Sequence, residues 1–179
     1  MRLTLIALLL AGCGSEPVSE FHATRQAAEQ GDADAQFRLG YMYEVGDGVP
    51  EDDTEATKWW FKAAEQGHVE AQSKLGFMYD LGRGVPEDHT EAVKWYRKAA
   101  EQGDADAQEF LGLMYGLGKG IPENDVEAYV WLSISAAGEN KEAKKSLAQA
   151  KARLTPVGLI AAQKRATKLF EQINATKAD

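Results

Sequence analysis

The 179-residue chain has one cysteine, Cys13, so no disulfide framework is expected within it. It also lacks an apolar run of the roughly 18 to 20 residues that a membrane-spanning helix needs, which argues against a transmembrane channel. Basic residues are in the minority, with 20 Lys and Arg against 28 Asp and Glu. Because phosphate backbones are bound by clustered surplus Lys and Arg, this balance disfavours nucleic acid as a partner. The five prolines and 17 glycines do not suggest a disordered chain.

The first thirteen residues have the composition of a secretory signal. Arg2 supplies a positive charge, residues 3–10 form a short apolar core, and small residues precede Cys13. The segment Leu10-Ala11-Gly12-Cys13 resembles the bacterial lipobox, which implies cleavage before the cysteine and a lipid on it. We therefore expect residues 1–12 to be a lipoprotein signal peptide and Cys13 to carry the anchor, because several acyl chains hold a protein stably at a membrane. The alternative is a buried N-terminal helix with an incidental cysteine.

The residues after Cys13 indicate in which membrane a lipoprotein would be located. Gly14 stands where lipoprotein rules treat an Asp as an inner-membrane retention signal. In a Gram-negative host, the expected location is therefore the periplasmic face of the outer membrane. The segment 13–20 is short and polar, and we expect it to be a tether between the lipid and the folded domain.

A period of 36 residues organises the rest of the chain. The segment Ala-Ala-Glu-Gln-Gly occurs at residues 27–31, 63–67 and 99–103. Three copies, at 27–62, 63–98 and 99–134, are identical at 18 of 36 positions and contain no insertion. A fixed period in this range predicts stacked supersecondary units that bury their apolar faces against one another.

Each copy predicts two helices. In the first copy, one helix begins near Asp32, carries Leu39 on its apolar face and ends at Gly46, which suits a left-handed cap. The second helix follows Asp52 and Glu55, which have the spacing of a capping box that recurs in the other copies. Its apolar stripe ends before Gly67.

Glycine and tryptophan recur at fixed places in these helices. Gly40, Gly76 and Gly112 lie inside the first helices, where glycine costs about 1 kcal/mol relative to alanine. Their recurrence predicts that a neighbouring helix approaches too closely for a side chain. The repeated tryptophans, at 59, 95 and 131, are expected in the core. The variable residues beside them, at 60, 96 and 132, are expected to be partly exposed.

The pattern Ala35…Leu39-Gly40…Tyr43…Gly46…Gly48-Val49…Ala56…Trp59 resembles the Sel-one-like repeat, a relative of the tetratricopeptide repeat. The resemblance covers about residues 21–154 and implies an all-α, right-handed α-solenoid that acts as a protein-interaction adaptor.

The two ends of the repeat array depart from the pattern, and only a partial helix is expected before the first copy. Residues 135–154 are expected to be a partial fourth repeat, and residues 155–179 a C-terminal capping helix and tail. Bacterial members of the family are often secreted or lipid-anchored.

The first helices have a second face, which varies between copies. It carries Asp34, Phe37, Tyr41, Glu44, Glu70, Ser73, Phe77, Asp80, Asp106, Glu109 and Leu113. In tetratricopeptide-like stacks the corresponding face lines a concave groove, so Tyr41, Phe77 and Leu113 would form an apolar row. Acidic residues would lie along one edge of that row. This arrangement suits a basic amphipathic helix or an extended chain. The alternative is a solvated face whose aromatic rings are half-buried between helices.

The sequence contains no pattern typical of a catalytic site, a metal site or a cofactor site. The three histidines, His22, His68 and His89, have no carboxylate or cysteine in metal-ligand spacing. The last two occupy positions held by Asp in other copies, which predicts surface polarity. The Gly pairs follow helices and precede Pro, unlike a phosphate-binding loop. We expect no enzyme activity, no cofactor and no small-molecule substrate.

Three functions are compatible with these features. The first is an adaptor that holds envelope proteins together at the membrane. The second, implied by lipid-anchored relatives that act beside secreted phospholipase toxins, is an immunity protein that neutralises a basic toxin. The third is a carbohydrate or peptidoglycan module that stacks sugars on the variable aromatics.

Charge is unevenly distributed along the chain. Residues 13–139 sum to −15, whereas residues 140–179 sum to +6. An acidic solenoid with a basic C-terminal part suggests two hypotheses: head-to-tail association, and contact of the basic part with anionic lipid.

Overall fold

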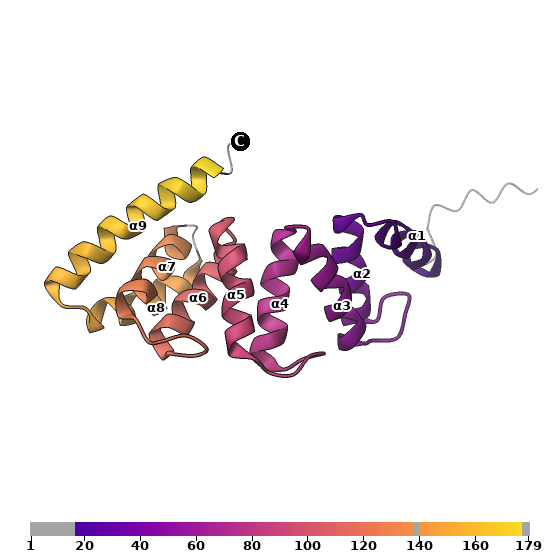
Figure 1. Cartoon of the computed structure of the whole chain (residues 1–179), viewed down its shortest axis with the longest axis horizontal. Coiled ribbons are helices and arrows are strands. Elements are labelled where there is room, and N and C mark those ends of the chain that lie inside the picture. Colours follow the sequence, from indigo (N-terminus) through magenta and orange to yellow (C-terminus); the bar gives the residue numbers. More distant parts are fainter. Residues whose placement is uncertain (1–16, 138–139, 177–179) are drawn as a thin grey trace, which may run out of the picture.

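A computed structural model describes residues 17–137 and 140–176, which form nine helices and no strand. Figure 1 shows the helices following one another along an elongated stack, with α1 at one end and α8 and α9 at the other. The helices are α1 (Pro17–Glu29), α2 (Ala33–Val45), α3 (Asp53–Glu65), α4 (Val69–Leu81), α5 (His89–Glu101), α6 (Ala105–Leu117), α7 (Asp125–Ala137), α8 (Lys141–Arg153) and α9 (Pro156–Thr176). Within the described ranges, no helix is both long enough and apolar enough to cross a bilayer.

The helices pack as the 36-residue period predicts. α2 packs on α3, α4 on α5 and α6 on α7, and each pair contacts the next one. Asp32 begins α2 by accepting a hydrogen bond from the backbone N–H of Ala35 at 2.8 Å. Gly46 ends that helix with φ of 73°. The all-α solenoid of helix pairs is therefore confirmed.

The expected capping box forms only in part. Asp52 accepts hydrogen bonds from the N–H groups of Thr54 and Glu55, as the spacing predicts. The N–H of Asp52 donates to the carbonyl of Tyr43 at 2.9 Å, which ties the connecting loop to the end of α2. Glu55 pairs with Lys58 instead. The second helix is thus fixed at its start by its own first helix rather than by a reciprocal box.

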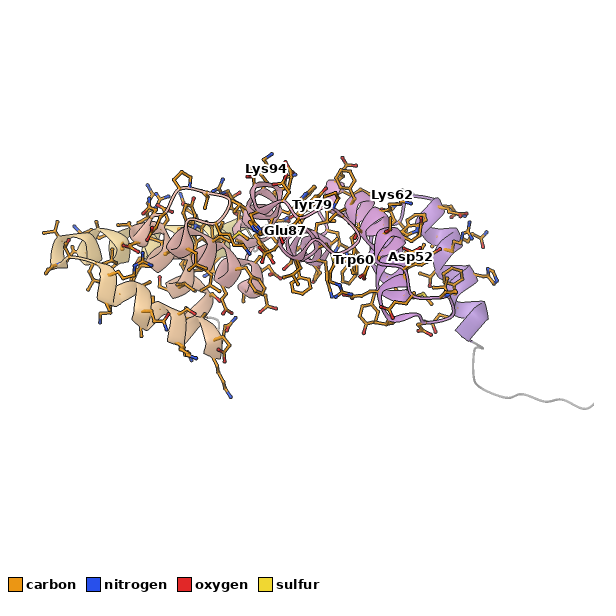
Figure 2. All side chains as sticks on the ribbon, turned by 90° about the horizontal axis from the view of Figure 1, so that it is seen from below. Asp52, Trp60, Lys62, Tyr79, Glu87 and Lys94 are labelled. Carbon is orange, nitrogen blue, oxygen red and sulfur yellow. The ribbon has the colours of Figure 1, made fainter. Side chains whose placement is uncertain are left out.

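The repeated glycines allow close helix contact, as expected. A methyl group on Gly40 would lie 2.5 Å from the indole of Trp60, one on Gly76 the same distance from the Tyr96 ring, and one on Gly112 2.7 Å from Leu132. The expectation that Trp60, Tyr96 and Leu132 are partly exposed is therefore wrong. They are 0%, 0% and 2% exposed, because each fills the space opposite its glycine (Figure 2 shows Trp60 between the helices). Trp95 and Trp131 are buried as expected, whereas Trp59 is half-buried.

A buried ladder of glutamines joins successive repeats. Gln36, Gln72 and Gln108 each donate a hydrogen bond to a carbonyl at the end of the preceding second helix, at 3.0 to 3.1 Å. Gln66 and Gln102 donate to the side-chain oxygens of Gln36 and Gln72 at 2.7 and 2.8 Å. Buried amides need such partners, which accounts for the identity of these positions in all three copies.

The N-terminal end differs from the expectation. α1 begins at Pro17 and has 13 residues, the same length as the helices that follow, so it is not a partial helix. Residues 17–20, expected to belong to the tether, are helical. Phe21 explains the difference, because it is 6% exposed and its ring packs edge-on against Tyr43 at 5.8 Å. The expected signal peptide and the lipid site predicted at Cys13 lie outside the described residues.

The C-terminal end follows the expectation more closely. Asn140 caps α8, which lies in the expected partial fourth repeat, and the hydroxyl of Thr155 accepts a hydrogen bond from the N–H of Gly158 at the start of α9. α9 packs against α7 and runs back along the stack (Figure 1). Its buried residues are Ala162, Ala166 and Ile173.

Candidate functional site

A groove of about 390 Å³ lies across α2, α4 and α6, the first helices of the three repeats. Its apolar lining consists of the half-buried rings of Phe37, Phe77 and Phe110. The polar residues that line it are Glu70, Ser73, Lys74, Asp104 and Asp106. Aromatic rings therefore alternate with polar groups across three repeats.

A second hollow of about 450 Å³ adjoins this groove at α2 and α4. It is lined by Asp34, Phe37, Arg38, Tyr41, His68 and Glu70, so the two share Phe37 and Glu70. Tyr41 is 49% exposed. We call the residues lining these two hollows the first-helix groove. The structure thus brings together seven of the residues predicted from the variable face: Asp34, Phe37, Tyr41, Glu70, Ser73, Phe77 and Asp106.

Four carboxylates line the first-helix groove, and none has a Lys or Arg partner among the described residues. Asp104 is occupied as the cap of α6 and accepts hydrogen bonds from Ser73 and Ala107. The other three are open to a partner. Asp34 and Glu70 lie 3.4 Å from the two ring nitrogens of His68, and their side chains are 89% and 66% exposed. Asp106 is also exposed and accepts a hydrogen bond from the amide of Asn140 at 3.5 Å. The groove therefore has a negative edge whose charge is available to a partner.

His68 is a structural residue, and its expected role as surface polarity is wrong. Its Nδ1 accepts a hydrogen bond from the N–H of Ala71 at 3.3 Å and so caps α4. Its ring stacks on Phe37 at 4.6 Å, because an imidazole at this cap is large enough to reach the preceding repeat. His89 is also half-buried, between Asp80 and Glu87 at 3.1 Å from each. Across the described residues, no three His, Cys, Asp or Glu side chains are grouped to hold a metal ion.

Some variation on the predicted face reflects contacts between repeats. Phe37 stacks on His68, which caps the next first helix. At the equivalent position Ser73 donates a hydrogen bond to the next cap, Asp104, at 3.1 Å. In the third copy the next cap, Asn140, donates to Glu109 at 2.7 Å. Each side chain matches the cap that follows it, so variability here does not by itself indicate a binding site.

The remaining predicted residues lie outside the first-helix groove. Glu44 pairs with Lys74 at 2.9 Å, and Asp80 pairs with Lys119 at the same distance. Leu113 is half-buried and packs against the core cluster around α6 and α7. The two ion pairs join neighbouring repeats.

Sequence reasoning missed Phe110, which stacks on the buried ring of Tyr96 at 5.1 Å and lines the groove. The signal was present, because residues three and four positions after Asp106 lie on the same helix face. The predicted variable face includes the third position, Glu109, and omits the fourth. The same omission applies to Lys74 in the second copy.

Comparisons with solved structures agree with this architecture. The Sel1 repeat protein from Oxalobacter formigenes is 41% identical, with a TM-score of 0.67, and the match covers 73% of this chain and 98% of that one. The protein c5321, a protective antigen present in uropathogenic Escherichia coli strains and displaying an SLR fold, is 35% identical with a TM-score of 0.72. That match covers 83% of this chain, which spans 33% of c5321. Helicobacter pylori cysteine rich protein B shares the fold at 22% identity and a TM-score of 0.56, over 75% of this chain and 98% of that one.

No curated protein shows significant similarity to the chain. The Sel1 repeat family matches residues 33–68, 69–104 and 105–140, which keeps the 36-residue period and moves its start to the beginning of each first helix. Sel1 repeat proteins typically mediate protein–protein interaction. The matched spans cover more than half of the chain, and the chain belongs to the Sel1 repeat family.

Proposed function

We propose that this protein is an adaptor that binds a basic segment of another protein in the first-helix groove. The observation that carries the proposal is a set of three carboxylates, Asp34, Glu70 and Asp106, that lie beside the aromatic lining of the groove and have no Lys or Arg partner among the described residues. These carboxylates recur at the same position in three successive repeats, so they follow the groove along the stack.

The geometry suits a segment with two kinds of side chain. Apolar side chains would contact Phe37, Phe77 and Phe110, and Lys or Arg side chains would reach the carboxylates. Exposed ion pairs contribute about 0.2 to 1 kcal/mol each, so most of the affinity would come from the apolar contacts. The charges would mainly speed association and select basic partners, and added salt would weaken both effects.

We also propose that the protein is anchored through a lipid on Cys13 at the periplasmic face of the outer membrane. The support is the lipobox-like segment Leu10-Ala11-Gly12-Cys13 and the absence of Asp at position 14. Labelled palmitate is expected to enter the wild-type protein and not the Cys13→Ser variant. Label that persists in the variant would refute the anchor without bearing on the groove.

The groove is tested by affinity purification from detergent-solubilised envelopes, with partners identified by mass spectrometry. The matched variant is Tyr41→Ala combined with Glu70→Lys, because both side chains are exposed and neither belongs to the core. Val157→Ala, at a 78% exposed position on α9, is the control. Partners recovered with wild type and control but lost with the groove variant are expected. Equal recovery by all three would contradict the proposal, and a single secreted toxin as partner would point to immunity instead.

A further inference from the structure

A separate apolar pocket of about 460 Å³ lies at the junction of the first and second repeats. Its walls are Trp59 and Phe61 from α3, Tyr79 from α4 and Val85 from the loop after α4. Its rim is formed by Thr54, Glu55, Thr57, Lys58, Lys62 and Gly84. None of these residues lines the first-helix groove, so the pocket is a different surface, which we call the junction pocket.

The next junction in the same chain shows what fills this position. Arg97 and Tyr115 stand 36 residues after Phe61 and Tyr79. The guanidinium of Arg97 lies 5.9 Å from the centre of the Tyr115 ring and donates a hydrogen bond to its hydroxyl at 2.8 Å. At the first junction Phe61 supplies no donor. Its ring is 38% exposed and rests edge-on against Trp95 at 5.7 Å. The chain therefore fills one junction with its own side chain and leaves the other open.

Two lysines give this side of the protein a positive charge. The ammonium of Lys62 lies 3.7 Å above the Trp59 ring, and that of Lys98 lies 4.0 Å above the Trp95 ring. Among the described residues neither lysine has a carboxylate within 4 Å, whereas Lys58 and Lys94 pair with Glu55 and Glu91. Figure 2 shows Lys62, Tyr79 and Lys94 toward the same edge of the stack. In a strongly acidic region, cations without acidic partners are available to an anionic ligand.

We propose that the junction pocket binds an acidic peptide segment of a partner protein. One large apolar side chain of that segment enters between Phe61, Tyr79 and Val85. Its flanking carboxylates pair with Lys62 and Lys98. A stacked sugar is a poorer fit, because Lys62 covers the face of Trp59 that a sugar ring would need. This surface has the opposite charge preference to the first-helix groove.

The test uses the acetylated, amidated peptide Glu-Glu-Leu-Glu-Glu as the probe and nitrogen-15 NMR titration at low salt as the readout. Shifts are expected at Phe61, Lys62 and Tyr79 and not at Tyr41. The variant Phe61→Arg copies the second junction, and it is expected to weaken binding at least tenfold. The reciprocal variant Arg97→Phe is expected to open a second pocket and add shifts around Tyr115.

Three controls make the outcome decisive. Far-ultraviolet circular dichroism and urea unfolding establish that both variants are folded. Lys-Lys-Leu-Lys-Lys is expected not to bind the pocket, and the Tyr41→Ala and Glu70→Lys variant is expected to bind Glu-Glu-Leu-Glu-Glu normally, which separates this site from the first-helix groove. Unchanged binding to folded Phe61→Arg, or shifts confined to the residues of the first-helix groove, would overturn the proposal.

Discussion

Two glycines in α6 give a direct test of the helix contacts that hold each repeat together. Gly112 faces its own second helix, where an added methyl group would lie 2.7 Å from Cγ and 3.1 Å from the backbone N of Leu132. Gly116, one turn later, has the Cβ of Ala128 at 3.6 Å as its nearest neighbour, which is ordinary contact. The same substitution, Gly to Ala, therefore adds a methyl group where there is no room for it at Gly112 and where there is room for it at Gly116.

The contact penalty can be separated from helix propensity because both variants replace a helical glycine with alanine, although the propensity gain is smaller at Gly116, the last residue but one of α6. Replacing glycine with alanine in a helix interior stabilises by about 1 kcal/mol. Overpacking a buried site costs about 1 to 3 kcal/mol, and Leu132 cannot move into solvent because it is 2% exposed. Gly116→Ala is expected to stabilise the protein by about 0.5 to 1 kcal/mol. Gly112→Ala is expected to be less stable than Gly116→Ala by about 1 to 3 kcal/mol.

Urea unfolding followed by circular dichroism measures both variants. In a Leu132→Ala background the penalty at Gly112 is expected to shrink, because the atom that the methyl group meets is removed. Equal free energies of unfolding for Gly112→Ala and Gly116→Ala would refute the close-contact explanation of the repeated glycines.

Two further stability predictions concern buried polar groups. Tyr96→Phe is expected to stabilise by about 1 kcal/mol in urea unfolding, because the buried Tyr96 hydroxyl has no hydrogen-bond partner among the described residues. Burial, with a smaller effect of the Asp80 charge, raises the pKa of Tyr96 well above its ordinary value of 10. Ionisation of Tyr96 therefore leaves the free energy of unfolding unchanged below pH 10. Above pH 10 it lowers the stability of the wild type, because the phenol ionises in the unfolded state first, so Tyr96→Phe is expected to lose less stability in alkali. Gln72→Ala is expected to cost about 1 to 3 kcal/mol, because it removes the donor to Ala64 and the acceptor for Gln102; an unchanged urea midpoint would contradict this.

The repeat architecture could be predicted from the sequence because the 36-residue period specifies local structure three times over. Asp32 and Gly46 mark the ends of a helix by their own chemistry, and Gly40 indicates a close neighbour because glycine is otherwise unfavourable there. These features depend on the residue itself or on its own repeat. They were confirmed wherever the structure describes them.

Variable positions were harder to interpret, because variation has two causes. Trp60, Tyr96 and Leu132 differ while facing the same glycine position, so their variability reflects repacking and not exposure. Phe37 and Ser73 differ because the following caps differ. Such pairings join residues about 30 positions apart, and only the folded stack shows them. The junction pocket was missed for the same reason.

The N-terminal boundary shows a third limit. Residues 17–20 are polar enough to suggest a tether, yet Phe21 is the large side chain that, with Ala28, holds α1 on α2. A single anchor without periodic support gives little signal in the sequence.

Site-specific photocrosslinking tests the central claim, that a partner protein binds in the first-helix groove, most directly. A benzophenone amino acid is placed at Tyr41 in the groove or, as the control, at Val157 on α9, and cells are irradiated before purification. Crosslinked partner at Tyr41 and none at Val157 is the expected result. Crosslinking of the same partner at Val157 with none at Tyr41 would contradict the assignment of the groove.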